Sequence, residues 1–448
     1  MPIKSPFTSN TLALVFAYAP AGLGHLRVTD ALRHGLPEDV QPILLPESSE
    51  SIRWIHRLTS RNPLGKRLME WAQYGRAEDI VTKVYRHMLV KDAHYLEEEL
   101  IKILKQRVVL PEKLLVVASH FGLAHQLSSI KKNLERRARV KVIIAMQVTD
   151  DSPQKIWYVP NLDLITVPSE LTRHALTSYG KSARLAPSKF VVLPYPLSPH
   201  LSEELLPAAH RHRRSQYDDK SSTPINVSIP ISGAAVGTPY ANVLMRELHK
   251  QSKRFVFHVV AKKSLYTEMF LNTLARKPYV EVSSSHSDRE IVELYEQVFD
   301  RVILSLEVTK PSEQAFKAMF SPKQSGGVIL LFTAPVGRQE YDNLGFLERH
   351  GLIPSQLEQE ELLSWSQKDW KLSEHEKKRL FASTSHWRGV KLPTDPLKAS
   401  QFITWAIREG FFASLSEATV CSRGDILCRE EVASDGVEKF WKEVEKIL

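Results

Sequence analysis

The chain of 448 residues has little cysteine and no long apolar run. Its two cysteines, Cys421 and Cys428, form no metal-ligand pattern and no disulfide framework, which fits a reducing compartment. No segment approaches the roughly 20 apolar residues of a membrane-spanning helix. Residues 12–20 resemble a signal-peptide core, but a glycine turn and a helical pattern follow directly, so we expect a first strand there. The sequence therefore predicts a cytoplasmic protein that is at most peripheral on a membrane.

Three motifs that hold phosphates or metals are also missing. The glycine-bearing loop 232–237 is not followed by Gly-Lys-Ser/Thr, which excludes a Walker loop there. The loop that follows residues 12–19 lacks the third glycine of the dinucleotide fingerprint, because Arg27 occupies that position. No Asp-x-Asp triad occurs, so a divalent-metal clamp on a diphosphate is not indicated. We expect no metal site and no resident cofactor.

The net charge of +9 is unevenly placed along the chain. Residues 1–200 hold 27 Lys and Arg against 18 Asp and Glu, so the whole excess lies in the N-terminal half. A basic domain favours an anionic partner such as a membrane surface, a nucleic acid or a phosphorylated substrate. Ordinary solvated basic surface explains the excess equally well. No nucleic-acid reader motif is recognisable, so we expect no nucleic acid.

Apolar runs alternate with helical patterns in both halves, which predicts an α/β fold with parallel, doubly wound sheets. We expect a first domain at 1–198, a linker at 199–224 rich in proline and charge, a second domain at 225–400 and a helical C-terminal segment at 401–448. Each domain begins with an apolar strand, a glycine-bearing turn and a helix, and we expect an interdomain cleft lined by strand ends. The strands are expected at residues 12–19, 114–118, 140–148, 162–167, 190–193, 225–229, 255–260, 280–283, 301–306 and 327–332.

In the first half, candidate functional residues follow two of the expected strands. Gly22 and Gly24 form a turn that ends in His25, at the start of a helix. Glycines allow close backbone approach, and a histidine there can act as a general base near neutral pH. Asp150 ends the strand at 140–148 and is the other candidate base or orienting group. A plain polar residue at a helix N-terminus is the alternative for His25.

In the second half, loop 232–237 contains Gly233 and Gly237, whose backbone N–H groups can cradle a diphosphate. A simple turn of small residues is the alternative. Glu313 follows the expected strand at 301–306, in a first helical turn opened by Pro311. A carboxylate there can accept both hydroxyls of a ribose, or it can merely stabilise the helix terminus.

Residues 335–351 are the most informative stretch, because they lie between an apolar strand and a short amphipathic helix closed by Gly351. Open α/β sheets bind their ligands at such strand ends. The amides of Gln339 and Asn343 are four residues apart, hence on one helical face, and can read sugar hydroxyls. Arg338 can meet a phosphate, and Glu340 stands beside the amides.

Residues 53–90 interleave aromatic and apolar side chains with arginines and lysines on a helical pattern. This composition suits an anionic membrane interface. A helix that packs its apolar stripe into the core and exposes a basic face is the competing interpretation.

Together these motifs resemble glycosyltransferase family 28, which includes monogalactosyldiacylglycerol synthase and the N-acetylglucosaminyltransferase that makes lipid II. The resemblance covers about residues 10–355. It is strongest in Pro311-Ser-Glu313 and in Pro335-x-x-x-Gln339-Glu340-x-x-Asn343 with the closing Gly351. It also rests on shorter motifs: Gly22-Leu-Gly-His25, Val148-Thr-Asp150, Val167-Pro-Ser-Glu170 and Val192-Leu-Pro-Tyr-Pro196.

The resemblance implies the GT-B architecture, with two Rossmann-like domains facing across a cleft, and a metal-independent, inverting reaction from a UDP-sugar. By position, Glu313 looks like the family's ribose-binding carboxylate, and Gln339 and Asn343 look like its donor-sugar amides. His25 looks like the acceptor-side histidine. Two loops depart from the family pattern: Ser232-Gly-Ala-Ala-Val-Gly237 replaces a Gly-Gly-Ser-type loop, and Pro20-Ala21 precedes the first glycines.

The sequence thus predicts an inverting transferase that moves a hexose or N-acetylhexosamine from a UDP-sugar to a lipid or other membrane-borne acceptor. Two alternatives share the fold. A non-hydrolysing nucleotide-sugar epimerase needs no separate acceptor. A catalytically decayed relative binds the UDP-sugar without turnover.

Overall fold

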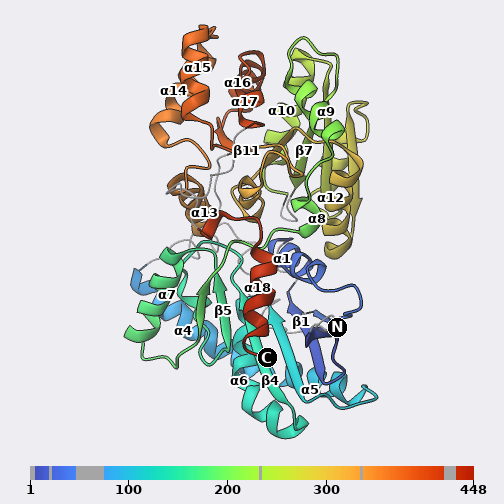
Figure 1. Ribbon diagram of the computed structural model, residues 1–448, viewed down its shortest axis with the longest axis vertical. Coiled ribbons are helices and arrows are strands. Elements are labelled where there is room, and N and C mark those ends of the chain that lie inside the picture. Colours follow the sequence, from blue (N-terminus) through green and yellow to red (C-terminus); the bar gives the residue numbers. More distant parts are fainter. Residues whose placement is uncertain (1–5, 20–22, 47–74, 232–234, 333–336, 418–429) are drawn as a thin grey trace. The chain divides into compact units, whose positions relative to one another are not determined.

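Both halves of the chain form a parallel sheet covered by helices in the computed structural model (Figure 1). The structure describes residues 6–19, 23–46, 75–231, 235–332, 337–417 and 430–448. By their internal contacts the residues divide into two units: unit 1 comprises 1–199 together with 435–448, and unit 2 comprises 200–434. Each unit is described by itself. Within the described ranges, no helix is long and apolar enough to cross a bilayer.

Unit 1 contains a six-stranded parallel sheet in the order β2-β1-β3-β4-β5-β6. This is the flavodoxin-like order with one further strand, and its direction reverses between β1 and β3. Its strands are β1 (Leu12–Tyr18), β2 (Ile43–Pro46), β3 (Lys113–Ala118), β4 (Lys141–Gln147), β5 (Leu164–Val167) and β6 (Phe190–Val192). Its helices are η1 (Pro6–Thr8), α1 (Leu23–His34), α4 (Gly75–Lys91), α5 (Ala93–Lys105), α6 (Phe121–Ala138), η2 (Lys155–Trp157), α7 (Glu170–Ser182) and α18 (Gly436–Glu445).

Helices cover both faces of this sheet. On one face, Val15 of β1 belongs to a buried cluster with Leu100 of α5 and Leu127 of α6. On the other face, the ring of Phe16 lies 6.1 Å from that of Trp441 in α18. The indole of Trp441 donates to the carbonyl of Leu32 at 2.8 Å, which fastens α18 to α1. The doubly wound arrangement predicted for the first half is therefore confirmed.

Unit 2 contains a second six-stranded parallel sheet in the order β12-β11-β10-β7-β8-β9. Numbered from its own first strand, this is the 3-2-1-4-5-6 order of dinucleotide-binding folds, with the switch point between β7 and β10. Its strands are β7 (Ile225–Ile231), β8 (Phe255–Lys262), β9 (Val280–Ser285), β10 (Leu306–Thr309), β11 (Val328–Phe332) and β12 (Gly389–Leu392). The two doubly wound sheets confirm the predicted α/β class.

The helices of unit 2 also lie on both faces of its sheet. Leu244 of α10 and Phe402 of α16 share a buried cluster with Val227 of β7, whereas α12 packs against β8 and β9 outside that cluster. The helices are α8 (Pro199–Ser202), α9 (Pro207–Tyr217), α10 (Thr238–Gln251), α11 (Glu268–Leu274), α12 (Asp288–Arg301), η3 (Glu313–Met319), α13 (Arg338–Arg349), α14 (Gln356–Gln367), α15 (Glu374–Ser383), α16 (Pro396–Arg408), α17 (Phe411–Leu415) and η4 (Glu430–Val432).

Several elements differ from the sequence prediction. The strand expected at 301–306 begins only at Leu306, because α12 continues to Arg301 and ends at Val302, whose N–H bonds the carbonyl of Val298. The edge strands β2 and β12, of four residues each, were not predicted. The expected linker, 199–224, contains α8 and the basic helix α9, and part of the expected C-terminal segment, 435–448, packs with unit 1.

Candidate functional site

His25 lies in the first turn of α1, beside the switch point of the first sheet. Its Nδ1 is 2.7 Å from the backbone carbonyl oxygen of Ser119, the residue that follows β3. A carbonyl only accepts hydrogen bonds, so Nδ1 carries a proton and donates it to Ser119. In the neutral ring the lone pair is therefore on Nε2, which is the nitrogen able to act as a base.

The hydroxyl groups of Thr29 and Ser119 hold this histidine in place. Thr29, one turn along α1, donates to the carbonyl oxygen of His25 at 2.8 Å. The hydroxyl oxygens of Thr29 and Ser119 are 2.8 Å apart. Because the Thr29 proton is engaged by the His25 carbonyl, we assign Ser119 as the donor in this pair. Ser119 therefore fixes the ring of His25 through its carbonyl, and its hydroxyl supports Thr29, which holds the backbone of His25.

The end of β4 completes the surroundings of His25. The hydroxyl of Thr149 is 3.3 Å from Nδ1 of His25 and 3.5 Å from Oδ2 of Asp150. Tyr195 donates its phenolic proton to the carbonyl of Thr149 at 3.2 Å. Asp150 is half-buried one residue beyond Thr149, so Thr149 lies between the two predicted catalytic candidates, which follow β1 and β4.

The neighbouring carboxylate, Asp151, has a structural role. It is almost fully buried and accepts hydrogen bonds from the hydroxyls of Ser169 and Thr172. Ser169 in turn caps α7 by accepting from the N–H of Thr172. Gly24 lies in the first turn of α1, and Gly22 lies outside the described residues.

His120 was not predicted, although it follows a buried strand at the switch point. Its ring is fully buried and meets the ring of His25 edge-to-face at 4.8 Å. Its Nδ1 accepts from the N–H of Gly122, so the ring caps α6 and carries its proton on Nε2 when neutral. The rings of Phe121 and Trp157, 5.2 Å apart, continue the aromatic surroundings. The signal was the pair Ser119-His120 directly after the apolar run 114–118.

In unit 2, the loop after β7 leads into α10 at the second switch point. Gly237 has φ +82°, and a Cβ there would lie 2.6 Å from the ring of Phe332, so the position favours glycine strongly. The ring of Phe332 stacks on Tyr240 at 5.3 Å, which packs the start of α10 against the end of β11. Gly233 lies outside the described residues.

The end of β10 carries the next candidates. Glu313 is the first residue of η3 and is half-buried. Lys310, directly after β10, forms an ion pair with the buried carboxylate of Glu340 on α13. The buried amide of Asn343 donates to the carbonyl oxygen of Pro311 at 3.3 Å. Glu340 and Asn343 thus tie α13 to the segment that contains Glu313.

The first turn of α13 holds the remaining candidates. Arg338 is half-buried and pairs with Asp342 at 3.3 Å, and Gln339 is half-buried beside it. The helix closes as predicted at Gly351, which has φ +65°. The N–H groups of Gly351 and Leu352 bond the carbonyls of Glu348 and Leu347, the pattern of a Schellman motif. From Arg338 on, the stretch singled out in the sequence is therefore a helix that follows β11, as expected, and residues 335 and 336 lie outside the described residues.

A buried ion pair supports the same strand end. The ammonium group of Lys317 in η3 pairs with the carboxylate of Glu307 in β10, and both side chains are almost fully buried. Tyr295 of α12 donates to the other oxygen of Glu307 at 2.8 Å. These contacts fix η3, and with it Glu313, against the sheet.

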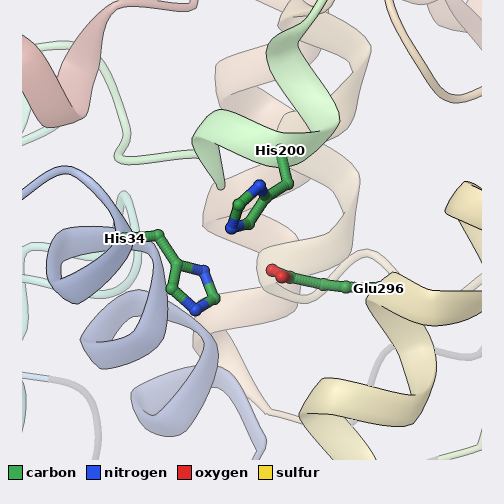
Figure 2. Close-up of side chains that lie close together, drawn as sticks. All are labelled: His34, His200 and Glu296. Carbon is green, nitrogen blue, oxygen red and sulfur yellow. The ribbon is translucent and has the colours of Figure 1, made fainter. Parts of the chain in front are cut away.

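A second pair of ionisable side chains lies elsewhere in unit 2. The imidazole of His200 on α8 and the carboxylate of Glu296 on α12 approach within 4.8 Å (Figure 2). His34, drawn in the same view, belongs to unit 1. Two side chains of one unit are too few for a metal site, and we assign none to them.

No protein-family model and no curated protein sequence matches the chain. Solved structures resemble it over nearly its whole length but with low identity. The Staphylococcus aureus MnaA–UDP complex is 11% identical, with a TM-score of 0.47 and coverage of 97% of this chain and 96% of that one. UDP-GlcNAc 2-epimerase from Neisseria meningitidis bound to UDP-GlcNAc is 9% identical (TM-score 0.47), and Acinetobacter baumannii MurG is 10% identical (TM-score 0.45). Each of these two comparisons covers 97% of this chain and 99% of the other. Values this low assign neither a family nor an activity.

Proposed function

We propose that the protein transfers a hexose or N-acetylhexosamine from a UDP-sugar, with inversion, to a lipid or other membrane-borne acceptor. The observation that carries this proposal is the state of His25. Its Nδ1 donates to the Ser119 carbonyl, so Nε2 is the basic nitrogen at the strand ends of unit 1. A general base held in one tautomer is what deprotonation of an acceptor hydroxyl requires.

In the proposed reaction, Nε2 of His25 takes the proton of the acceptor hydroxyl. The oxygen forms a bond to the anomeric carbon of the donor while the bond from that carbon to the diphosphate oxygen breaks. The products are the glycoside, UDP and a protonated His25, which then releases its proton to solvent. Asp150, which contacts His25 only through Thr149, would stabilise the imidazolium.

Donor binding is assigned to unit 2. Its 3-2-1-4-5-6 strand order is that of nucleotide-binding sheets, and the proposed groups follow three neighbouring strands, β7, β10 and β11. Glu313 would accept the ribose hydroxyls, and Gln339, with Glu340 and Asn343 behind it, would hold the sugar. The loop that contains Gly233 and Gly237 would meet the diphosphate together with the start of α10, and Arg338 would add a positive charge.

A membrane surface is the proposed source of the acceptor. Helix α4 exposes Ile80 (65%) and Val84 (56%) one turn apart, although most apolar stripes of this length are buried. Lys83 and His87 flank them on the same exposed side. An apolar ridge between basic side chains suits an anionic bilayer surface. The part of the predicted interfacial segment before Gly75 lies outside the described residues.

Product analysis tests the proposal. The purified protein is incubated with a panel of UDP-sugars, with and without extracted membrane lipids, and the products are identified by mass spectrometry. We expect a glycolipid and UDP with one donor, and neither product with His25→Gln. Conversion of the donor alone into another UDP-sugar would instead identify an epimerase, and binding without any product a decayed relative.

Donor binding is tested separately from turnover. A ligand that binds only the folded protein raises its melting temperature. UDP should therefore shift the melting temperature of the wild type, and Glu313→Gln should reduce that shift. Glu268→Gln is the matched control, because Glu268 is an exposed glutamate in the first turn of another helix of unit 2. If neither UDP nor any UDP-sugar shifts the wild type, the proposal fails.

A further inference from the structure

A groove on unit 2 lies apart from the switch point and is not used by the proposed reaction. Its volume is about 730 Å³, within the roughly 300–1,000 Å³ typical of small-ligand pockets. It runs between α13, α14, the end of the edge strand β12 and the start of α16. The lining includes three glutamines, one threonine and a tyrosine, namely Gln356, Gln359, Gln367, Thr394 and Tyr341. We propose that this groove binds a neutral saccharide.

An extended peptide does not fit the groove, because the outer edge of β12 is already covered. The N–H groups of Arg388 and Gly389 bond the carbonyl of Leu352 at 2.8 and 3.3 Å. The N–H of Lys391 donates to the side-chain oxygen of Gln359 at 3.0 Å. Strand addition needs a free row of backbone donors and acceptors, and these donors are taken.

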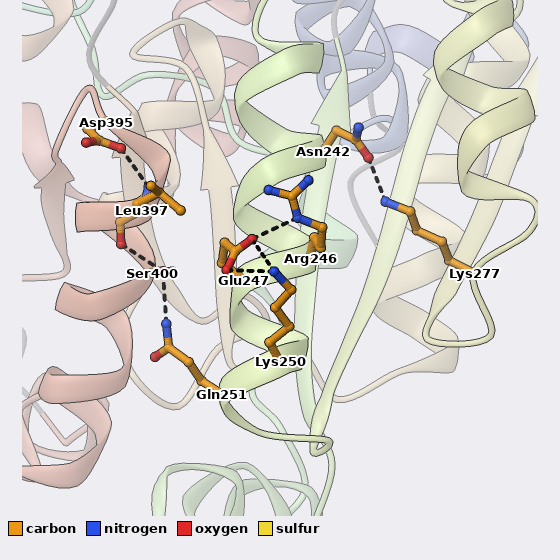
Figure 3. A network of polar contacts seen from close by, with 9 residues as sticks. All are labelled: Asn242, Arg246, Glu247, Lys250, Gln251, Lys277, Asp395, Leu397 and Ser400. Atoms are coloured by element: carbon orange, nitrogen blue, oxygen red, sulfur yellow. Dashed lines mark hydrogen bonds and ion pairs between the residues drawn. The ribbon is translucent and has the colours of Figure 1, made fainter.

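An anion does not fit either. The groove ends at the start of α16, where helix N–H groups often bind phosphate. Here Pro396 at the first helical position has no N–H. The carboxylate of Asp395 accepts a hydrogen bond from the N–H of Leu397 at 2.8 Å (Figure 3), so this donor is also taken. The lining carboxylates Glu348, Glu360 and Asp395 outnumber the lysines Lys391 and Lys398. An added negative charge would meet a net negative wall.

Two of the lining carboxylates are already engaged by other side chains of the lining. Lys391 pairs with Glu348 at 2.5 Å, and Gln356 donates to Glu360 at 3.0 Å. What remains is amide and hydroxyl chemistry above an apolar floor made by Leu344, Leu363 and Pro393. Sugar hydroxyls both donate and accept hydrogen bonds, as amides do, and the C–H face of a sugar ring packs on apolar side chains.

Two side chains make the fit more specific. The ring of Tyr341 is 58% exposed at the groove and offers a flat face for a sugar ring. Gln359 is 5% exposed, its Oε1 is held by Lys391 N–H, and its Nε2 has no hydrogen-bond partner in the described part of the chain. A buried amide donor without a partner is costly, so Gln359 is a polar group at the groove wall that lacks an acceptor.

The groove is connected to the proposed donor site by two elements. Helix α13 presents Tyr341 and Leu344 to the groove, while Glu340 and Asn343 of the same helix are tied to the end of β10. Tyr240, at the start of α10, donates to the carbonyl of Pro393 in the groove wall at 2.9 Å. A saccharide in the groove would therefore touch α13 directly and α10 only through Pro393. The saccharide site itself stands without the proposed function.

Saturation-transfer NMR with the full-length protein tests the site. The probes are maltotriose and N,N′-diacetylchitobiose, with glucose 6-phosphate as the anionic comparison. We expect a neutral probe to bind with millimolar affinity and to remain bound when UDP is added. Tyr341→Ala should weaken binding about fivefold or more, since an aromatic contact is lost. Gln367→Ala should weaken it as well.

The matched control is Tyr266→Ala, which removes a comparably exposed tyrosine of unit 2 outside the groove. It should leave binding unchanged, and all three variants should melt at the wild-type temperature because the altered side chains are exposed. Failure of every neutral probe to bind overturns the proposal. The proposal is also overturned if Tyr341→Ala and Gln367→Ala bind the saccharide as well as the wild type does. It is likewise overturned if glucose 6-phosphate binds equally well, or if UDP displaces the saccharide. If the wild-type protein binds a saccharide but does not bind UDP, only the proposed function is contradicted.

Discussion

Thr29 holds the backbone of His25 through a single hydroxyl, and this makes it a test of how precisely the base must be placed. Thr29→Val keeps the shape of the side chain but removes its donation to the His25 carbonyl and its contact with Ser119. We expect kcat to fall about tenfold with little change in the donor KM, because a misplaced base affects the chemical step. Steady-state kinetics with the identified donor and acceptor measure this.

Thr29→Ser retains the hydroxyl and should restore most of the rate. Nitrogen-15 NMR of the imidazole gives a readout that does not depend on turnover. His25 should carry its proton on Nδ1 in the wild type and lose that preference in part in Thr29→Val. An unchanged tautomer together with an unchanged kcat would show that Thr29 merely packs.

His125 predicts a pH dependence of stability. It is buried in α6, its Nε2 donates to the carbonyl of Ile156 at 2.9 Å, and burial, with the nearby charge of Arg86, lowers its pKa from 6.5 to about 3. Between these values the unfolded chain binds a proton that the folded chain does not. The contribution of neutral His125 to the free energy of unfolding is therefore complete above pH 6.5, and it is lost as the pH falls toward 3.

Urea unfolding at several pH values tests this contribution. Each pH unit below 6.5 should cost about 1.4 kcal/mol from this group. His125→Gln should flatten the slope in that range, whereas His87→Gln, at an exposed position of α4, should not. An equal slope in His125→Gln and the wild type would contradict the assignment.

At the scale of elements, the exposed ridge of α4 should decide membrane association. Ile80→Ser with Val84→Ser removes apolar area from an exposed face, so binding to vesicles containing phosphatidylglycerol should fall about tenfold while the fold is retained. Flotation of the protein with vesicles measures this. Leu265→Ser, at a 90% exposed leucine of unit 2, is the control. Equal flotation of the two variants would place the membrane contact elsewhere.

The Lys317–Glu307 pair should be the most sensitive contact of β10 and η3. Lys317→Met leaves the buried carboxylate of Glu307 without its ammonium partner, which should cost about 3–5 kcal/mol in the free energy of unfolding. The double variant Lys317→Met with Glu307→Gln removes both charges and should recover much of that loss. Urea unfolding of the single and double variants measures both effects. If the double variant is as unstable as the sum of the single changes, the two charges are not coupled.

Patterns of apolar and polar residues predicted most of the central strands and the two glycine-bearing turns. They failed at β12 (Gly389–Leu392), which includes a lysine and lies between helices in sequence. Periodicity cannot detect four residues whose partner, β11, is about 60 positions away. The patterns also misplaced the boundary after α12. Apolar residues continue from this helix through Val302 toward the following strand, so the pattern does not show where the helix ends.

The sequence indicated candidate residues for the site, but it did not indicate the contacts that these residues make. His25 and Asp150 could be found because each lies in the short segment that follows an apolar run. Thr29 and Ser119 could not, because a helical threonine and a serine after a strand are common, and their pairing depends on the β1–β3 register. The burial of Glu340 and Asn343 was equally hidden, since it arises from Lys310 and Pro311 on another element.

At the scale of the whole molecule, unit 1 is built from two separate stretches of chain. Trp441 of α18 lies 5.0 Å from the ring of Phe7 and donates to Leu32. Trp441→Ala should therefore destabilise unit 1 by about 3–5 kcal/mol. Unit 2 should be unaffected, so thermal unfolding should separate into two transitions. The free energies of the two transitions check this.

Trp370→Ala is the control, since this indole belongs to unit 2 and is 49% exposed. It should not lower the transition assigned to unit 1. A fragment of residues 1–199 should likewise be less stable alone than with a peptide of residues 435–448 added. If the peptide has no effect on the fragment, α18 is dispensable.

The return of α18 to unit 1 has a consequence for synthesis on the ribosome. All of unit 2 is translated between residues 199 and 435, so the first unit waits for its last helix. At roughly 5–20 residues per second this delay is on the order of tens of seconds. During that time the apolar surface around Phe16 and Phe7 has no Trp441 to cover it. The nascent chain should therefore be a client of chaperones until α18 emerges.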